Sequence, residues 1–219
     1  YFLRKNKTFS FTLRGLSVKE SLYCLVNGGS EFINQLAVAI TTIVFNRTAL
    51  AFAGEDGVAA VSIIMYLQFL FIGVYSGWAY GEGKMDVCRK LERYAHRFFA
   101  IAPFVIYALT YFLASAGVSC FVERSNAVFP IAVTGMRIYG LGFLFSGINI
   151  FASVRMMAYG KGYFSGMITF LRSFALLLLF LTILPQKLGL TGIWLAVPAA
   201  EVLTMLVAVW FLRPMQKTK

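Results

Sequence analysis

The stretch that decides the fold is residues 98–121, FFAIAPFVIYALTYFLASAGVSCF, which contains no charged side chain. At a rise of about 1.5 Å per residue, a helix of this length crosses a hydrocarbon layer roughly 30 Å thick. Apolar and polar residues do not alternate along it with a period of two, which a membrane-spanning strand would require. The stretch therefore predicts a transmembrane helix, in which every backbone polar group is satisfied internally.

Further apolar stretches of similar length occur along the chain. They cover about residues 21–50, 58–80, 131–152, 164–184 and 190–212. Turn-forming residues separate them, for example Gly54-Glu55-Asp56-Gly57 and the segment from Pro185 to Gly189. We therefore predict an all-α, polytopic bundle of six transmembrane helices over residues 21–212, between a basic leader or link (1–20) and a tail (213–219).

Composition supports a lipid bilayer as the partner of these helices. Hydrophobic residues make up 59% of the chain and charged residues only 13%, against about 25% charged in a typical soluble domain. The net charge of +11 comes from Lys and Arg clustered beside the apolar stretches rather than on one polar face, so nucleic-acid binding is not predicted.

The basic clusters also predict the topology. They lie in residues 1–20, in the links after the second and the fourth apolar stretch, and in the tail, and Lys and Arg are retained on the cytoplasmic side. Both ends are therefore expected in the cytoplasm of a multi-pass cell-membrane protein. Because the chain begins at Tyr1 rather than Met, we expect it to be a fragment of a longer protein.

An enzyme is not predicted. His96 is the only histidine, the three cysteines share no short spacing, and no acid-rich pair suits a magnesium-dependent membrane enzyme. We expect no cofactor and no metal site.

A polar stripe follows one side of the first predicted helix. At 100° per residue, its members share a face: Asn27, Ser30, Glu31, Asn34, Gln35, Thr41, Thr42 and Asn46. Such a stripe is consistent either with interhelical hydrogen bonding or with a water-filled cavity, and periodicity leaves both open. An acid within a span is costly, so we interpret Glu31 as a proton, cation or substrate contact, with Asn27, Asn34 and Gln35 as candidate binding neighbours.

A second acid, Glu201, lies within the last apolar stretch. Arg172, on the preceding stretch, falls at a matching depth because the two predicted helices are consecutive and antiparallel. We predict an ion pair between them and interpret it as structural. Ser146, Asn149 and Ser153 form a weaker polar face that we interpret as packing.

Several segments together resemble the multidrug and toxic compound extrusion (MATE) transporters. The segments are Asn27-Gly28-Gly29-Ser30-Glu31-Phe32 with Phe45-Asn46, Gly57-Val58-Ala59-Ala60, Arg137-Ile138-Tyr139 with Gly142-Phe143, Gly147-Ile148-Asn149-Ile150, and Trp194-Leu195-Ala196-Val197-Pro198 with Glu201. They follow the order of the family's seventh, eighth, tenth and twelfth helices. The resemblance implies the C-terminal six-helix lobe of a twelve-helix transporter, whose N-terminal lobe would be its partner.

The resemblance also implies a function. MATE transporters are antiporters that use proton or sodium as the coupling ion to export drugs and organic cations, so a small amphipathic or cationic substrate is expected. By resemblance, Glu31 matches a carboxylate implicated in cation or drug binding. Two alternatives stay open, namely a lipid-linked saccharide flippase of the wider superfamily and a truncated, non-transporting membrane remnant.

Overall fold

The computed structural model describes the backbone of residues 18–81, 88–158 and 162–212, and the side chains of 35–75, 98–99, 101–157 and 163–211. The chain divides into two units, Tyr1–Ala37 and Val38–Lys219. The first is helical from Val18 onward over its described part. The packing reported below is that of the second unit. The predicted leader up to residue 17 and the predicted tail lie outside the described residues.

Every regular element of the described residues is helical, as the all-α prediction requires. The elements are α1 (Val18–Gly81), α2 (Cys88–Ser119), α3 (Val128–Tyr139), the 3-10 turn η2 (Gly140–Gly142), α4 (Phe143–Ala158), α5 (Gly162–Phe170), the π-helical turn η3 (Leu171–Ala175), α6 (Leu176–Leu188) and α7 (Leu190–Leu212). Among the described residues, five of the resulting helices are long and apolar enough to cross a membrane.

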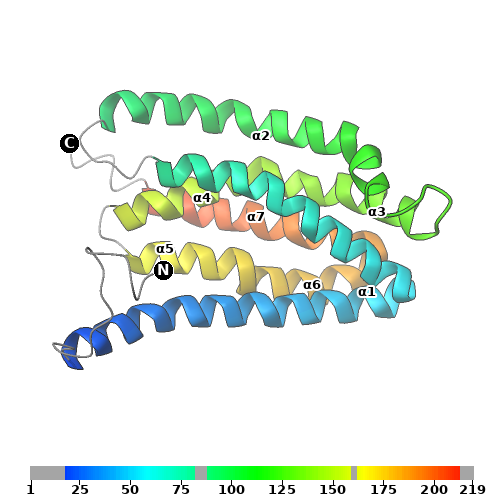
Figure 1. Ribbon diagram of the computed structural model, residues 1–219, viewed down its shortest axis with the longest axis horizontal. Coiled ribbons are helices and arrows are strands. Elements are labelled where there is room, and N and C mark those ends of the chain that lie inside the picture. The colour runs from blue at the N-terminus through cyan, green and yellow to red at the C-terminus, as the bar shows by residue number, and fades with distance from the viewer. Residues whose placement is uncertain (1–17, 82–87, 159–161, 213–219) are drawn as a thin grey trace, which may run out of the picture. The chain divides into compact units, whose positions relative to one another are not determined.

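The first of these five crosses twice, which gives the predicted six passes. Gly54 interrupts α1 with φ 61° and ψ −152°, values that do not belong to a helix. This backbone region is essentially restricted to glycine, so the chain can reverse there, and Figure 1 shows the second arm of α1 running back from the turn. The prediction of six membrane-spanning helices is therefore confirmed.

The remaining passes are continuous or nearly so. Gly140–Gly142 joins α3 to α4, and the π-helical turn joins α5 to α6. The prediction of a loop over residues 185–189, between α6 and α7, is wrong, because α6 includes Pro185 and ends at Leu188. A single residue, Gly189 with φ 58°, turns the chain.

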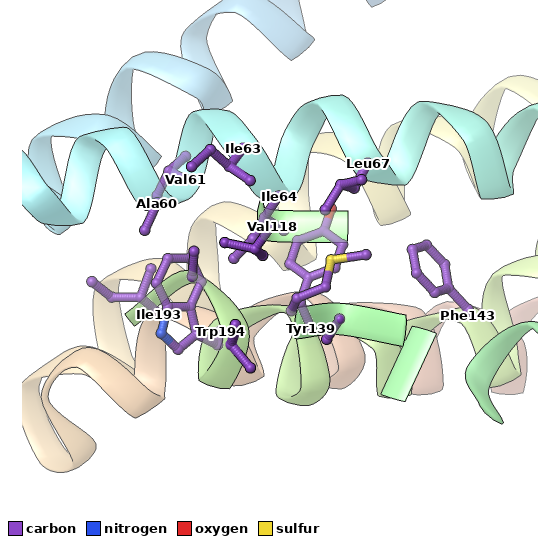
Figure 2. Packing of buried hydrophobic residues seen from close by; sticks show 14 of the residues in the cluster. Ala60, Val61, Ile63, Ile64, Leu67, Val118, Tyr139, Phe143, Ile193 and Trp194 are labelled. Atoms are coloured by element: carbon purple, nitrogen blue, oxygen red, sulfur yellow. The ribbon is translucent and has the colours of Figure 1, made fainter. Parts of the chain in front are cut away.

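The core lies between the second arm of α1, α2, α3 and α7. Trp194 is 1% exposed and packs in one cluster with Ile64 and Val118, as Figure 2 shows. Gly135 makes this approach possible, since a Cβ atom there would lie 2.8 Å from Trp194 Cε2. Large apolar side chains also face outward, including Phe104, Phe112 and Trp210. Exposed apolar surface on this scale fits lipid rather than water as the surrounding solvent.

Candidate functional site

A cavity of about 540 Å³ opens within the second unit. Both arms of α1, the junction of α3 and α4, the π-helical turn, α6 and α7 contribute to its wall. The lining residues are Val38, Thr41, Thr42, Phe45, Asn46, Ser62, Met65, Tyr66, Gln68, Phe69, Ile72, Tyr139, Gly142, Phe143, Ser146, Arg172, Ser173, Leu177, Val197 and Glu201. A volume of this size accommodates a drug-sized molecule.

The wall is mainly aromatic and aliphatic, with a few polar groups. Phe45, Tyr66, Phe69 and Phe143 supply flat apolar surface, and such side chains bind the apolar body of a ligand with little loss of conformational entropy. The polar groups are hydroxyls and amides, apart from the charged residues among the described lining, Arg172 and Glu201, which lie together.

Arg172 and Glu201 form the predicted ion pair. Arg172 Nη2 lies 2.5 Å and Nε 3.1 Å from Glu201 Oε1. The side chains are 15% and 7% exposed, respectively. Hydrogen bonding compensates for the desolvation that a buried pair suffers, which is severe in a membrane interior. The contact is present in the structure, whereas its role as a structural pair stays a prediction.

Asn149 of α4 holds the other side of the Glu201 carboxylate. Its Nδ2 donates to Glu201 Oε2 at 2.6 Å and to the Glu201 backbone oxygen at 2.9 Å. Asn149 is fully buried, and its Oδ1 has no hydrogen-bond partner among the described residues. Both carboxylate oxygens of Glu201 are therefore engaged, so this acid is fixed in position.

The π-helical turn places Arg172 at the cavity. A π turn widens the helix locally and leaves backbone groups that need other partners. Thr41, on the first arm of α1, donates from Oγ1 to the Ser173 backbone oxygen at 3.1 Å. This contact joins α1 to the turn that carries Arg172.

Two tyrosines bond to residues of the cavity wall, and Tyr139 itself belongs to that wall. Tyr139 donates a short hydrogen bond to Gln68 Oε1, which joins α3 to the second arm of α1. Tyr75, fully buried on the same arm, donates to the Phe143 backbone oxygen at 2.9 Å.

The structure describes the side chains of only part of the predicted polar stripe. The side chains of Asn27, Glu31 and Asn34 lie outside the described residues, and Gln35 is exposed within the first unit. Their predicted roles are therefore untested. Farther along the same stripe, Thr41, Thr42 and Asn46 line the cavity. Thr41 also makes an interhelical hydrogen bond, so both interpretations apply to that part of the stripe.

Other cavity residues do not stand out from the sequence. Gln68 and Tyr139 carry only the weak signal of polar groups within apolar spans. Asn149 is a partner of Glu201, in addition to the packing role that its polar face suggests. Among the described residues, no group of three or more His, Cys, Asp or Glu side chains is placed to hold a metal ion.

The arrangement of helices matches solved membrane transporters. A multidrug resistance MATE family transporter of the MOP superfamily, in an inward-facing conformation, has a TM-score of 0.80 at 20% identity, with 100% of this chain and 54% of that chain covered. A MOP superfamily transporter from Pyrococcus furiosus has a TM-score of 0.74 at 19% identity, covering 98% and 51%. A mutant form of the Vibrio cholerae MATE transporter VcmN has a TM-score of 0.73 at 21% identity, covering 96% and 50%.

These similarities concern the fold. No protein-family profile matches the chain, and no curated protein matches its sequence. The chain spans about half the length of the solved transporters. It is a membrane protein that has the fold of one half of a MATE transporter.

Proposed function

We propose that the chain forms one lobe of a cation-coupled antiporter that exports amphipathic drugs or organic cations across the cell membrane. The observation that carries this proposal is the cavity of about 540 Å³ within a helical lobe of the MATE fold. Its aromatic and aliphatic wall, interrupted by a few polar groups, is typical of a site for drug-sized molecules.

A second lobe is the proposed partner. The solved transporters are about twice as long as this chain, and transporters of this kind alternate access by moving one repeat against the other around a central site. By the resemblance in sequence, the present chain is the C-terminal lobe. The clusters of Lys and Arg support the proposal that both of its ends are cytoplasmic.

Coupling is assigned to Glu31, with Asn27, Asn34 and Gln35 as its binding neighbours. Proton or sodium serves as the coupling ion. A carboxylate whose affinities for the ion and for the drug differ between inward-facing and outward-facing states shifts the balance between those states. The energy of the ion gradient then becomes available for moving the drug.

Proteoliposomes that contain the full-length protein provide the test. Ethidium flux is measured under an imposed proton gradient and, separately, under an imposed sodium gradient. We expect one gradient to drive flux and Glu31→Gln to abolish the gradient-driven part. The matched control is Glu55→Gln, which neutralises an exposed acid in the turn within α1. Unchanged flux in Glu31→Gln would remove Glu31 from the mechanism.

A lipid-linked saccharide flippase is the second candidate. The feature that favours it is the Arg172 guanidinium in the cavity wall, because arginine pairs well with phosphate groups. The Pyrococcus furiosus transporter of the same fold is itself described as having a binding pocket of reversed polarity that suggests a different function. Movement of a lipid-linked saccharide between leaflets, with no ethidium flux, would favour this candidate.

A further inference from the structure

We infer that the ligand of this cavity is an amphipathic organic anion whose charged oxygen group binds the Arg172 guanidinium, with Glu201 and Asn149 acting as positioning residues. The inference rests on the proposed function only in that the cavity binds a small molecule. It differs from the expectation of an organic cation.

Arg172 keeps N–H donors for a further hydrogen bond after it pairs with Glu201. Both of its donating nitrogens, Nε and Nη2, point at the same oxygen, Glu201 Oε1. Nη1 has no hydrogen-bond partner among the described residues. It is also not among their buried unpartnered atoms, which are Asn46 Oδ1 and Asn149 Oδ1. The Arg172 side chain is 15% exposed, and Arg172 lines the cavity.

Glu201 offers no comparable opening. Its Oε1 accepts from Arg172 and its Oε2 accepts from Asn149. Its side chain is 7% exposed, about half the 15% of Arg172. A ligand cation that reaches this pair meets an acid that is already paired, whereas a ligand anion meets the remaining N–H donors of Arg172.

The Arg172 guanidinium is held in place before a ligand binds. The carboxylate that orients it is fixed by Asn149 on α4, and the turn that carries it is fastened to α1 by the bond from Thr41 to the Ser173 carbonyl. Preorganised donors bind an anion with little ordering cost. Arginine also binds carboxylate and phosphate in well-defined, charge-assisted geometry.

The apolar wall of the cavity indicates the chemistry of the rest of the ligand. Phe45, Tyr66 and Phe143 provide aromatic surface in the same wall. A molecule with an aromatic body and one anionic end satisfies both the apolar wall and Arg172.

The test uses three probes that share one ring system, namely naphthylacetic acid, naphthylacetamide and naphthylethylamine. They present a carboxylate, a neutral amide and an ammonium group. Their affinities are measured by calorimetry on the purified full-length protein in lipid nanodiscs at neutral pH. We expect the acid to bind about tenfold more tightly than the amide, as one hydrogen bond to a charged group provides, and the amine to bind weakest.

Variants separate a binding role from a structural role. Arg172→Gln should abolish the difference between acid and amide. Glu201→Gln keeps one acceptor oxygen for Arg172 but removes the negative charge beside the bound anion, so it should strengthen binding of the acid relative to the amide. A residue that served only to hold the fold would weaken all three probes together. Lys187→Gln, which removes an exposed basic residue on α6 outside the cavity wall, is the matched control and should change nothing.

Each other outcome overturns the inference. Equal affinities for acid and amide, a preference that survives in Arg172→Gln, or a uniform loss in Glu201→Gln would each show that Arg172 does not select the ligand. Tightest binding of the amine would also overturn the inference while supporting the proposed export of organic cations. Binding of none of the probes would count against the cavity as a ligand site, and so against the proposed function as well.

Discussion

Asn149 holds Glu201 at two points, with Nδ2 2.9 Å from the Glu201 backbone oxygen and 2.6 Å from its Oε2. One buried amide thus fixes both the backbone of α7 and the direction of the only carboxylate in the described cavity wall. The position of Arg172, and with it the charge distribution of the cavity, depends on this contact.

Asn149→Leu should destabilise the protein. The variant leaves Glu201 Oε2 without its described donor in a buried site, and such an unsatisfied group costs about 1–3 kcal/mol. Unfolding in mixed detergent micelles measures the change. Thr182→Val is the control, since it removes an exposed hydroxyl that, among the described residues, bonds to the Leu179 carbonyl of its own helix. A loss no larger than that of Thr182→Val would contradict the bracing role of Asn149.

Arg172 and Glu201 should show strong coupling in a double-mutant cycle. Arg172→Met and Glu201→Met each leave one buried charge unpaired, which is expected to lower the free energy of unfolding by about 3–5 kcal/mol. The double variant removes both charges and should cost much less than the sum. Additive losses would mean that the two side chains do not stabilise each other, and the same unfolding assay distinguishes these results.

Gly147 is expected to tolerate no side chain. A Cβ atom there would lie 2.8 Å from Tyr75 Cε1. The Tyr75 ring is fully buried, and its hydroxyl donates a hydrogen bond to the Phe143 backbone oxygen. Gly147→Ala should therefore cost about 1–3 kcal/mol through overpacking. Gly166→Ala is the matched control, because a Cβ atom at Gly166 meets nothing within 4 Å. Equal thermal stabilities of the two variants would show that the Tyr75 ring moves aside freely.

Much of this architecture can be predicted from the sequence because long apolar runs leave few alternatives in a membrane. The glycines of residues 54–57 mark the reversal within α1, and the pairing of Arg172 with Glu201 follows from matching depths on consecutive antiparallel helices. Depth along a helix is readable from residue number. The rotation of one helix against another cannot be read from residue number. For that reason, the hydrogen bond from Asn149 to Glu201 cannot be predicted in the same way.

The local irregularities of the helices also could not be predicted from the sequence. A π-helical turn at Leu171–Ala175 depends on partners from other helices, such as the hydroxyl of Thr41. The segment from Pro185 to Gly189 resembles a loop because proline removes a backbone donor. Membrane helices tolerate proline when neighbouring groups compensate, so α6 continues to Leu188 and the turn is confined to Gly189.

Blocking the cavity tests the central claim, that ligands cross the membrane through this lobe's cavity. Ser62 lines the cavity and donates to the Val58 carbonyl of its own helix, whereas Ser119, outside the cavity wall, makes a comparable bond to the Ala116 carbonyl. The measurement is gradient-driven flux of ethidium, and separately of naphthylacetic acid, in proteoliposomes containing Ser62→Trp or Ser119→Trp in the full-length protein. The account predicts that Ser62→Trp loses flux while Ser119→Trp keeps it, at equal folded amounts. Undiminished flux in Ser62→Trp would contradict it.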